Sequence, residues 1–197
     1  MRTEWTPEDL PGRAFYKLLT ALVVPRPIAW VSTTSAAGVD NLAPHSFFTV
    51  ASTDPPIVQF TSVGRKDSLR NAEETGEFVV NLAPESLWKQ VNASGTPYPP
   101  EVDEFEALGI TRQASSAVRP PRVADSPAAL ECVVHSTVEL GDCTLVLGRV
   151  VCAAVADGVL VDGHPEVTRM RPLARLGRDE WSTLGEVTSL ARLPHRP

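Results

Sequence analysis

Arg65 and Lys66 stand side by side where the sequence changes from strand-forming to helix-forming residues. Asp67 and Ser68 follow them, and either residue can cap a helix that begins there. The free N–H groups and the positive dipole end of a helix favour an anion, and the two cations add formal charge. The pattern predicts a phosphate-binding site, with a pair of solvated surface cations as the alternative.

Polar side chains also gather on the segment that precedes this junction. Residues 28–32 and 57–62 are rich in strand formers, and the small residues at 35–38 suit a hairpin turn into a further strand. Pro44 has no N–H to donate to a β ladder, so it marks a strand edge or a kink. We therefore expect the polar groups of residues 41–48 to lie beside exposed backbone.

The sequence shows no arrangement typical of covalent or metal catalysis, and no catalytic residue is predicted. Gly-x-Ser-x-Gly is absent, and Asp67-Ser68 fits a helix cap better than a nucleophile. The histidines lie far apart and none forms a short ligand pair with a cysteine, so we expect no metal site. Cys132, Cys143 and Cys152 lie among apparent strand residues and are expected to be reduced core thiols, with a Cys132–Cys143 disulfide across a hairpin as the alternative.

The elements that must position these residues are short. Helices are expected at 69–74 and 84–91, with a strand at 78–82 between them. The proline-rich segment 92–100 is expected to be either a flap over a pocket or a plain connector, and 104–108 a helical turn. An N-terminal helix that packs against the body of the protein is predicted from four apolar residues on one helical face: Phe15, Leu18, Leu19 and Leu22.

Residues 129–155 carry the clearest strand pattern, because apolar residues alternate with polar ones from Leu130 to Leu140. We expect the apolar face to be buried and the face that carries Glu131 to lie opposite to it. Gly141-Asp142 predicts a hairpin, after which 144–155 returns with apolar residues on both faces. Six or seven strands with few helices favour a mainly β fold, an antiparallel closed or split barrel with short peripheral helices. No G-x-G-x-x-G motif follows a strand, so a nicotinamide cofactor would not be held by a Rossmann unit.

Length, composition and charge restrict the class of protein further. The 197 residues, 43% hydrophobic and 21% charged, predict one domain over 1–197, with a barrel core at about 12–168 and a wrapping tail at 169–197. A net charge of −6 argues against a nucleic-acid partner. The acidic N-terminal residues and the lack of a long apolar segment argue against a signal peptide and a membrane span, so a cytoplasmic location is expected.

Several motifs occur in one order along nearly the whole chain, at 25–33, 41–48, 54–56, 65–71, 76–82, 103–109, 120–123, 175–177 and 184–187. Together they resemble the flavin reductase-like family, whose members have an FMN-binding split β-barrel and include flavoredoxins and NAD(P)H:flavin oxidoreductases. Two departures are visible. Trp181 stands where a tyrosine is usual, and Ser68 where a threonine is common.

The resemblance implies FMN as the cofactor and NADH or NADPH as the electron donor, with hydride transferred from the nicotinamide to flavin N5. It also implies that the isoalloxazine and ribityl groups contact Ser32, Thr33, Asn41, Ala43 and Ser46, and that the phosphate contacts Ser62, Arg65 and Lys66. His45 and Trp181 complete the set of candidate cofactor-binding residues, with a core anchor as the alternative for Trp181.

Three functions are compatible with this resemblance. The first is an NAD(P)H-dependent flavin reductase, which can supply a partner monooxygenase. The second is an FMN electron carrier, similar to flavoredoxin, that serves a redox protein. The third is a flavoenzyme that reduces an organic substrate directly on bound FMN.

A homodimer is the expected assembly, with the flavin sites near the interface. The predicted strand 144–155 carries apolar residues on both faces, whereas a small barrel has one interior. A second copy of the chain would cover the outer face, and the family resemblance points the same way. The alternative is that the tail at 169–193 covers this face within the same chain.

Overall fold

The computed structural model describes residues 1–193, and a seven-stranded antiparallel sheet is its main element. The strands lie in the order β3-β2-β6-β9-β10-β5-β4. Their bounds are β2 Ala29–Thr34, β3 Asp40–His45, β4 Phe48–Ser52, β5 Ile57–Val63, β6 Glu77–Leu82, β9 Ala128–Leu140 and β10 Cys143–Val155.

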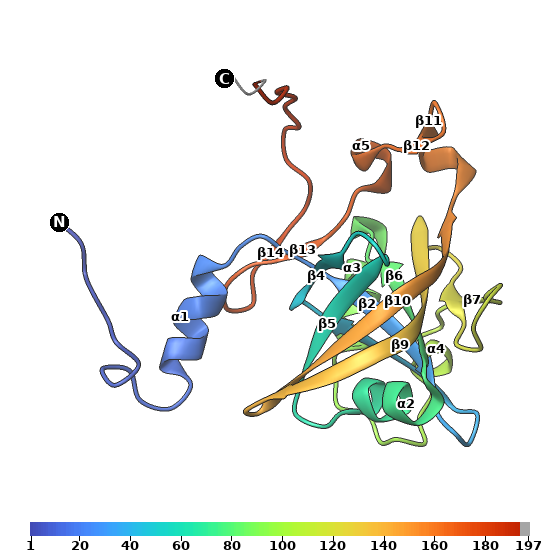
Figure 1. Cartoon of the computed structure of the whole chain (residues 1–197), viewed down its shortest axis with the longest axis horizontal. Helices are drawn as coiled ribbons and strands as arrows, with labels where there is room; N and C mark the ends of the chain where they lie inside the picture. Colours follow the sequence, from blue (N-terminus) through green and yellow to red (C-terminus); the bar gives the residue numbers. More distant parts are fainter. Residues whose placement is uncertain (194–197) are drawn as a thin grey trace.

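The two edge strands of this sheet, β3 and β4, are joined directly by Ser46 and Phe47. The sheet must therefore curl until its edges meet, and the Thr61 N–H of β5 donates to the Phe47 carbonyl at 2.9 Å. This curl gives the rounded form in Figure 1. The prediction of a mainly antiparallel split barrel with few short helices is confirmed.

Shorter elements surround the barrel. The helices are α1 Ala14–Leu22, α2 Asp67–Thr75, α3 Trp88–Ala93, α4 Glu104–Ala107 and α5 Val167–Met170, with 3-10 turns at Glu85–Leu87 and Asp157–Val159. Small sheets are formed by β1 Arg26–Pro27 with β13 Ala174–Arg175 and β14 Trp181–Ser182, by β7 Arg112–Gln113 with β8 Arg122–Val123, and by β11 Leu160–Val161 with β12 His164–Pro165. In Figure 1, α2 lies across one end of the barrel.

Two apolar clusters hold these elements together. The barrel interior contains Phe60 and Phe78, whose rings pack edge to face at 5.2 Å, and α2 closes it with Leu69 and Ala72. Position 148 must be a glycine for these rings to pack, because a Cβ there would lie 2.2 Å from the Phe78 ring. The second cluster lies outside the barrel and joins β2 and β3 to α3 and α4: Ile28, Trp30, Leu42, Ala83, Val91, Phe105, Ile110, Val123 and Leu173.

The N-terminal helix differs from the expectation. In α1 no residue is buried, and Leu19 and Leu22 are 47% and 68% exposed. The prediction that all the apolar residues of this helix pack against the barrel is therefore wrong within a single chain. Arg26 holds the helix at its C-terminal end, donating to the carbonyls of Thr20 and Val23.

The β9–β10 hairpin also differs from the simple alternation. Val138 and Leu140 are 44% and 55% exposed, because the tip of the hairpin extends past the barrel and the register shifts between Leu147 and Gly148. Glu131 is fully buried although it lies on the polar face of the pattern. It accepts hydrogen bonds from Arg122 and from the N–H groups of Ser116 and Ala117, so the loop before β9 covers this face.

The rest of the chain follows the expected order with local changes. The helix predicted at 84–91 divides into a 3-10 turn and α3. The tail pairs with β1 up to Ser182, whereas residues 185–193 are exposed and extend away from the barrel (Figure 1). Cys132, Cys143 and Cys152 are free thiols, so the disulfide alternative is not present. Only Cys132 is buried, so the prediction of core thiols is wrong for the half-buried Cys143 and Cys152. Within residues 1–193, no helix is long and apolar enough to cross a bilayer.

Candidate functional site

A pocket of about 550 Å³ lies where the two edges of the sheet meet. Its walls are the edge strand β3, the link to β4, the end of β5, the start of α2 and the proline-rich segment at 94–100. The volume falls in the range of small-molecule sites. The segment predicted to be a flap or a connector therefore forms one wall of a cavity.

The N-terminus of α2 opens into this pocket. Lys66 occupies the N-cap position in extended backbone and no side chain caps the helix, so the N–H groups of its first turn lack an intrahelical partner. Gly64 makes the turn into the helix at φ +73°, a backbone conformation that suits glycine. The helix begins at Asp67, as predicted, but neither Asp67 nor Ser68 caps it.

The cations beside the start of this helix differ in whether they form ion pairs. Arg65 pairs with Glu73 at 2.6 Å, and Arg70 pairs with Asp67 at 2.5 Å. Among the described residues, Lys66 makes no ion pair. A free ammonium group and a free helix N-terminus at one wall form a site for an anion such as phosphate.

Asn41 and Glu104 form the buried polar wall of the pocket. The Asn41 amide donates to Glu104 Oε1 at 2.9 Å and accepts from Ser68 Oγ at 3.0 Å, and the Leu42 N–H donates to Glu104 Oε2 at 3.0 Å. Burial raises the pKa of Glu104, and the hydrogen bonds from Leu42 and Asn41 oppose this rise in part. These bonds fix α4 and the end of the 94–100 segment to β3.

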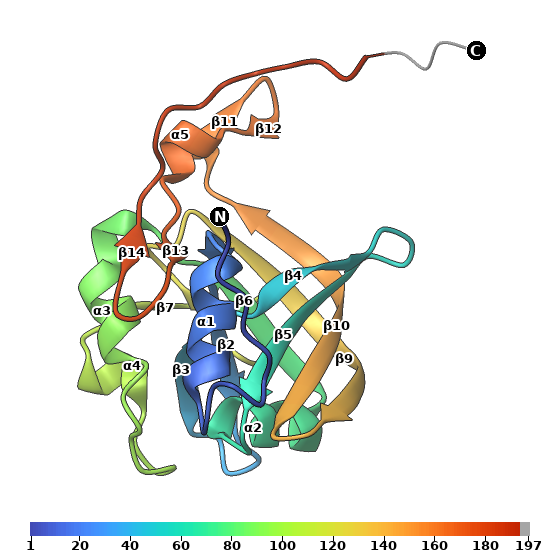
Figure 2. The same ribbon diagram turned by 90° about the vertical axis from the view of Figure 1, so that its left-hand side faces the viewer.

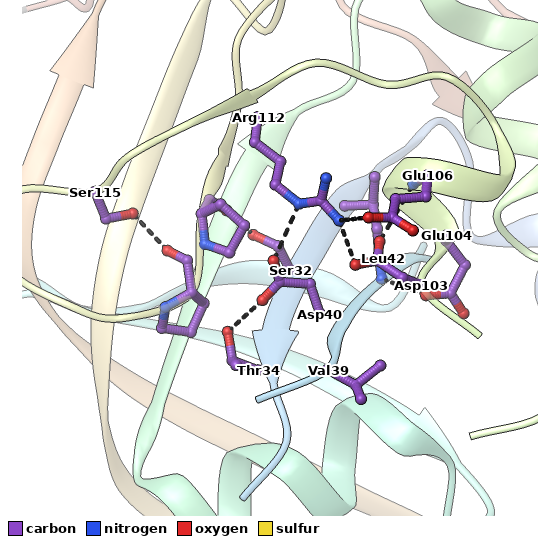
Figure 3. Close-up of polar contacts among 12 residues, drawn as sticks. Ser32, Thr34, Val39, Asp40, Leu42, Asp103, Glu104, Glu106, Arg112 and Ser115 are labelled. Atoms are coloured by element: carbon purple, nitrogen blue, oxygen red, sulfur yellow. Dashed lines mark hydrogen bonds and ion pairs between the residues drawn. The ribbon is translucent and has the colours of Figure 1, made fainter. Parts of the chain in front are cut away.

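Arg112 reinforces this wall from outside. Figure 3 shows its guanidinium group between Asp40 on β3 and Asp103 before α4, with Glu106 near by. Its Nε donates to Asp40 at 3.1 Å, and the group also lies 5.1 Å from the centre of the Phe105 ring. This clamp, formed by Arg112 with Asp40 and Asp103, holds α4 against β3. It thereby keeps Glu104 next to Asn41, although the two residues are far apart in sequence.

His45 also lines the pocket, at the end of β3. Its side chain is almost fully buried, packs 4.6 Å from the Phe60 ring and places Nδ1 3.3 Å from the Thr61 carbonyl. Nε2 has no hydrogen-bond partner among the described residues. Burial lowers the pKa of His45 to about 4, opposed by the Thr61 carbonyl and assisted by the charge of Lys66. The imidazole is therefore neutral at pH 7.

The structure brings together six of the ten residues predicted to bind the cofactor: Asn41, Ala43, His45, Ser46, Arg65 and Lys66. The other four lie outside the pocket, and three of them are fully buried with internal partners. Ser32 donates to the Pro121 carbonyl, Thr33 contacts Asn41 and Asn71, and Ser62 donates to the Gly64 carbonyl. These hydroxyls support the residues around the pocket and do not face it.

Trp181 lies just beyond the pocket. It packs against the outer apolar cluster and also lines a cavity of about 210 Å³ that shares Pro44, Ser46 and Gly95 with the main pocket. Trp181 is thus an anchor of the outer apolar cluster at the edge of the pocket, and contact with the cofactor stays a prediction.

Sequence reasoning missed several lining residues. They are Tyr16, Thr61, Val63, Asp67, Ser68, Arg70, Ser94, Thr96, Tyr98 and Glu104, among others. The proline-rich loop was the available signal for those at 94–98. Glu104 gave no local signal, since its partners Asn41 and Leu42 belong to another motif. Within the described residues, no cluster of histidine, cysteine or acidic side chains could hold a metal ion.

A family model for the flavin reductase like domain matches residues 21–169. The chain belongs to the flavin reductase-like family. The family resemblance inferred from the motifs is confirmed, and we assign the chain to the flavin-related oxidoreductases. One relative of this chain is the uncharacterized protein BH2278 of Halalkalibacterium halodurans, which is 40% identical to it, and the match covers 94% of both chains.

Two solved structures are similar over almost the full length. Nitrilotriacetate monooxygenase component B from Bacillus cereus superposes with a TM-score of 0.92 at 33% identity, covering 96% of this chain and 99% of that one. The 2-nitrobenzoate 2-nitroreductase NbaA of Pseudomonas fluorescens superposes with a TM-score of 0.91 at 27% identity, covering 99% and 98%.

Proposed function

We propose that this member of the flavin reductase-like family binds FMN in the pocket at the sheet edges and reduces flavin with NADH or NADPH. The observation that carries the proposal is the uncapped N-terminus of α2, which opens into the pocket beside Lys66. A phosphate monoester fits this site, because backbone N–H groups and an ammonium group both donate to its oxygens.

The remaining walls suit the rest of the cofactor. The edge strand β3 turns the backbone of Leu42 away from β2, and Ala43, Pro44 and Ser46 line the pocket beyond it. A flavin ring presents both donors and acceptors along its pyrimidine edge, and the Ser46 hydroxyl can act as either, whereas the Leu42 N–H is already bonded to Glu104. The neutral His45 adds no charge next to the ring.

Bound flavin supplies the hydride chemistry, so the protein need only bind, orient and shield it. The clamp from Arg112 through α4 to Asn41 holds one wall in place, and the 94–100 segment forms a further wall. Within the described residues, no cluster of side chains could hold a metal ion, which is compatible with chemistry supplied by the flavin.

Purification tests the proposal directly. We expect the protein to bind FMN with a yellow colour, and NADH or NADPH to bleach that colour under anaerobic conditions. Turnover of added free FMN supports the reductase. Bound flavin that neither nucleotide reduces supports an electron carrier instead, and a protein that fails to bind FMN in calorimetry contradicts the proposal altogether.

A second candidate is direct reduction of an organic acceptor on bound flavin. The similarity to NbaA, named as a 2-nitrobenzoate 2-nitroreductase, favours testing nitroaromatic acids as acceptors. The similarity to nitrilotriacetate monooxygenase component B favours testing transfer of reduced flavin to a partner monooxygenase. Consumption of the nitroaromatic acid without free flavin would identify the direct reductase.

We further propose that the protein works as a homodimer in a reducing compartment such as the cytoplasm. The three free thiols are compatible with reducing surroundings. The exposed apolar face of α1 lies next to the pocket, which Tyr16 lines, so a second copy on this face would lie close to the flavin site.

A further inference from the structure

A groove of about 450 Å³ lies outside the flavin pocket, between α3 and the small sheet that carries β14. Figure 2 shows these two elements side by side. The groove is lined by two tryptophans, two cations, one amide and one carboxylate: Trp88, Trp181, Lys89, Arg175, Asn92 and Asp179. It combines flat aromatic surface with positive charge.

The groove connects to the flavin pocket through shared residues. Asn92, Arg175 and Trp181 also line the cavity of about 210 Å³ described above. That cavity in turn shares Ser46 and Gly95 with the flavin pocket. A ligand in the groove can therefore extend toward a flavin bound in the main pocket.

The cations of the groove are not neutralised by the protein. The Arg175 guanidinium group lies 4.7 Å from the centre of the Trp181 ring and donates to the Arg178 carbonyl at 3.0 Å. Its one carboxylate contact within residues 1–193, Asp179 at 3.9 Å, is fully exposed and so screens the charge weakly. Lys89 makes no ion pair among the described residues.

Trp88 provides the aromatic surface of the opposite wall. Its side chain is 47% exposed and packs into neither apolar cluster, so an indole face remains open on the α3 side. Trp181 and the stacked Arg175 form the facing side. An aromatic ring inserted here can stack, and an anionic group on it can meet Lys89 and Arg175.

We propose that this groove binds a planar aromatic group that carries negative charge, next to the flavin site. Two sources share this chemistry: the adenosine phosphate end of a pyridine nucleotide, and an aromatic carboxylate that is reduced at the flavin. The inference rests on the proposed function for the direction in which the ligand extends, but binding in the groove is measurable without turnover.

The test is calorimetric titration of the FMN-loaded protein with ADP, with benzoate, and with the uncharged analogues adenosine and benzamide. We expect one of the two anions to bind at least tenfold more tightly than its uncharged analogue. Binding of ADP identifies the nucleotide source, and binding of benzoate the aromatic acid. Failure of both anions to bind overturns the inference, as does equal binding of the uncharged analogues.

Variants locate the site. Trp88→Ala and Lys89→Ala should each weaken the anion at least tenfold and leave FMN affinity unchanged, whereas the matched changes Trp5→Ala and Lys17→Ala outside the groove should have no effect. If the nucleotide is the ligand, Lys89→Ala should also raise its KM without lowering kcat. Unchanged anion binding in both groove variants contradicts the assignment. If the unmodified protein does not bind FMN, the proposed function is contradicted. The groove inference is then tested separately, by the same titrations of the protein without flavin.

Discussion

Lys66 is the residue on which the anion-binding prediction depends most directly. It occupies the N-cap position of α2 and, among described residues, makes no ion pair. Lys66→Ala should weaken FMN binding by about 1 to 3 kcal/mol, the cost of a charge-assisted hydrogen bond. Titration calorimetry measures the change, with Lys17→Ala as the matched control. Equal affinity in the two variants would remove the phosphate assignment.

His45 makes a prediction about stability and pH. Its pKa is about 4 in the folded protein and about 6.5 when unfolded, so the unfolded chain binds more protons below pH 6.5. The neutral ring contributes stability that is complete above pH 6.5 and is lost as the pH falls toward 4. From pH 7 to pH 5 this loss should reach about 2 kcal/mol.

Urea denaturation at the two pH values tests this effect. In His45→Leu the loss of unfolding free energy between pH 7 and pH 5 should be smaller by about the same 2 kcal/mol. His135→Leu changes an exposed histidine on β9 and should retain the full loss. Identical pH dependence in the His45 variant and the unmodified protein would show that this residue does not titrate as the structure indicates.

Individual residues show which parts of the candidate site could be predicted from the sequence. Arg65, Lys66, Asn41 and Ser46 could be placed at one pocket because they lie in motifs whose family pattern is specific. The hydroxyls of Ser32 and Ser62 could not be placed, because neighbouring strand residues point to opposite faces and a serine fits either face. In the structure Ser32 donates to the Pro121 carbonyl and Ser62 to the Gly64 carbonyl, so both hydroxyls bond to the backbone.

At the scale of elements, the pair of Glu131 on β9 and Arg122 on β8 fixes the loop that precedes β9. Glu131 is fully buried, and desolvation pushes its pKa upward, but the N–H groups of Ser116 and Ala117 together with Arg122 outweigh this effect and lower the pKa. Glu131→Ala leaves the Arg122 charge buried without its partner, so it should cost about 3 to 5 kcal/mol of stability.

The matched control for this loss is Glu139→Ala, an exposed glutamate on the same strand, which should change stability by about 0.5 kcal/mol or less. Replacing both partners, as Arg122→Met with Glu131→Leu, should recover much of the loss because no unpaired charge remains. Urea midpoints measure all three variants. A small effect of Glu131→Ala would mean that the loop rearranges to admit water.

Elements were predicted from sequence where periodicity is local. Strand-forming residues located β5 and β6, alternation located β9, and an apolar segment after the Gly141-Asp142 turn located β10. The cap candidates Asp67 and Ser68 located the start of α2. The burial of Glu131 was missed because it depends on a loop from another part of the chain, and the exposed hairpin tip was missed because alternation does not reveal where a barrel ends. The clamp of Arg112 on Asp40 is equally nonlocal.

For the whole molecule, the exposed apolar surface bears on assembly. Leu19 and Leu22 on α1 are exposed, and Val151 on β10 is 36% exposed, so it does not point into the barrel interior. The tail at 185–193 extends away and leaves this surface uncovered (Figure 2). A second copy of the chain is the covering that the sequence pattern and the family resemblance both favour.

We therefore predict that light scattering at micromolar concentration gives a dimer mass with flavin bound. Leu19→Asp and Val151→Asp should each yield a monomer with weaker FMN binding, because a charge buried at the interface without a partner costs several kcal/mol. Val161→Asp, at a similarly exposed apolar position on β11, should remain dimeric, since Figure 1 places β11 far from α1. A monomeric unmodified protein that retains FMN would show that each chain completes its own flavin site.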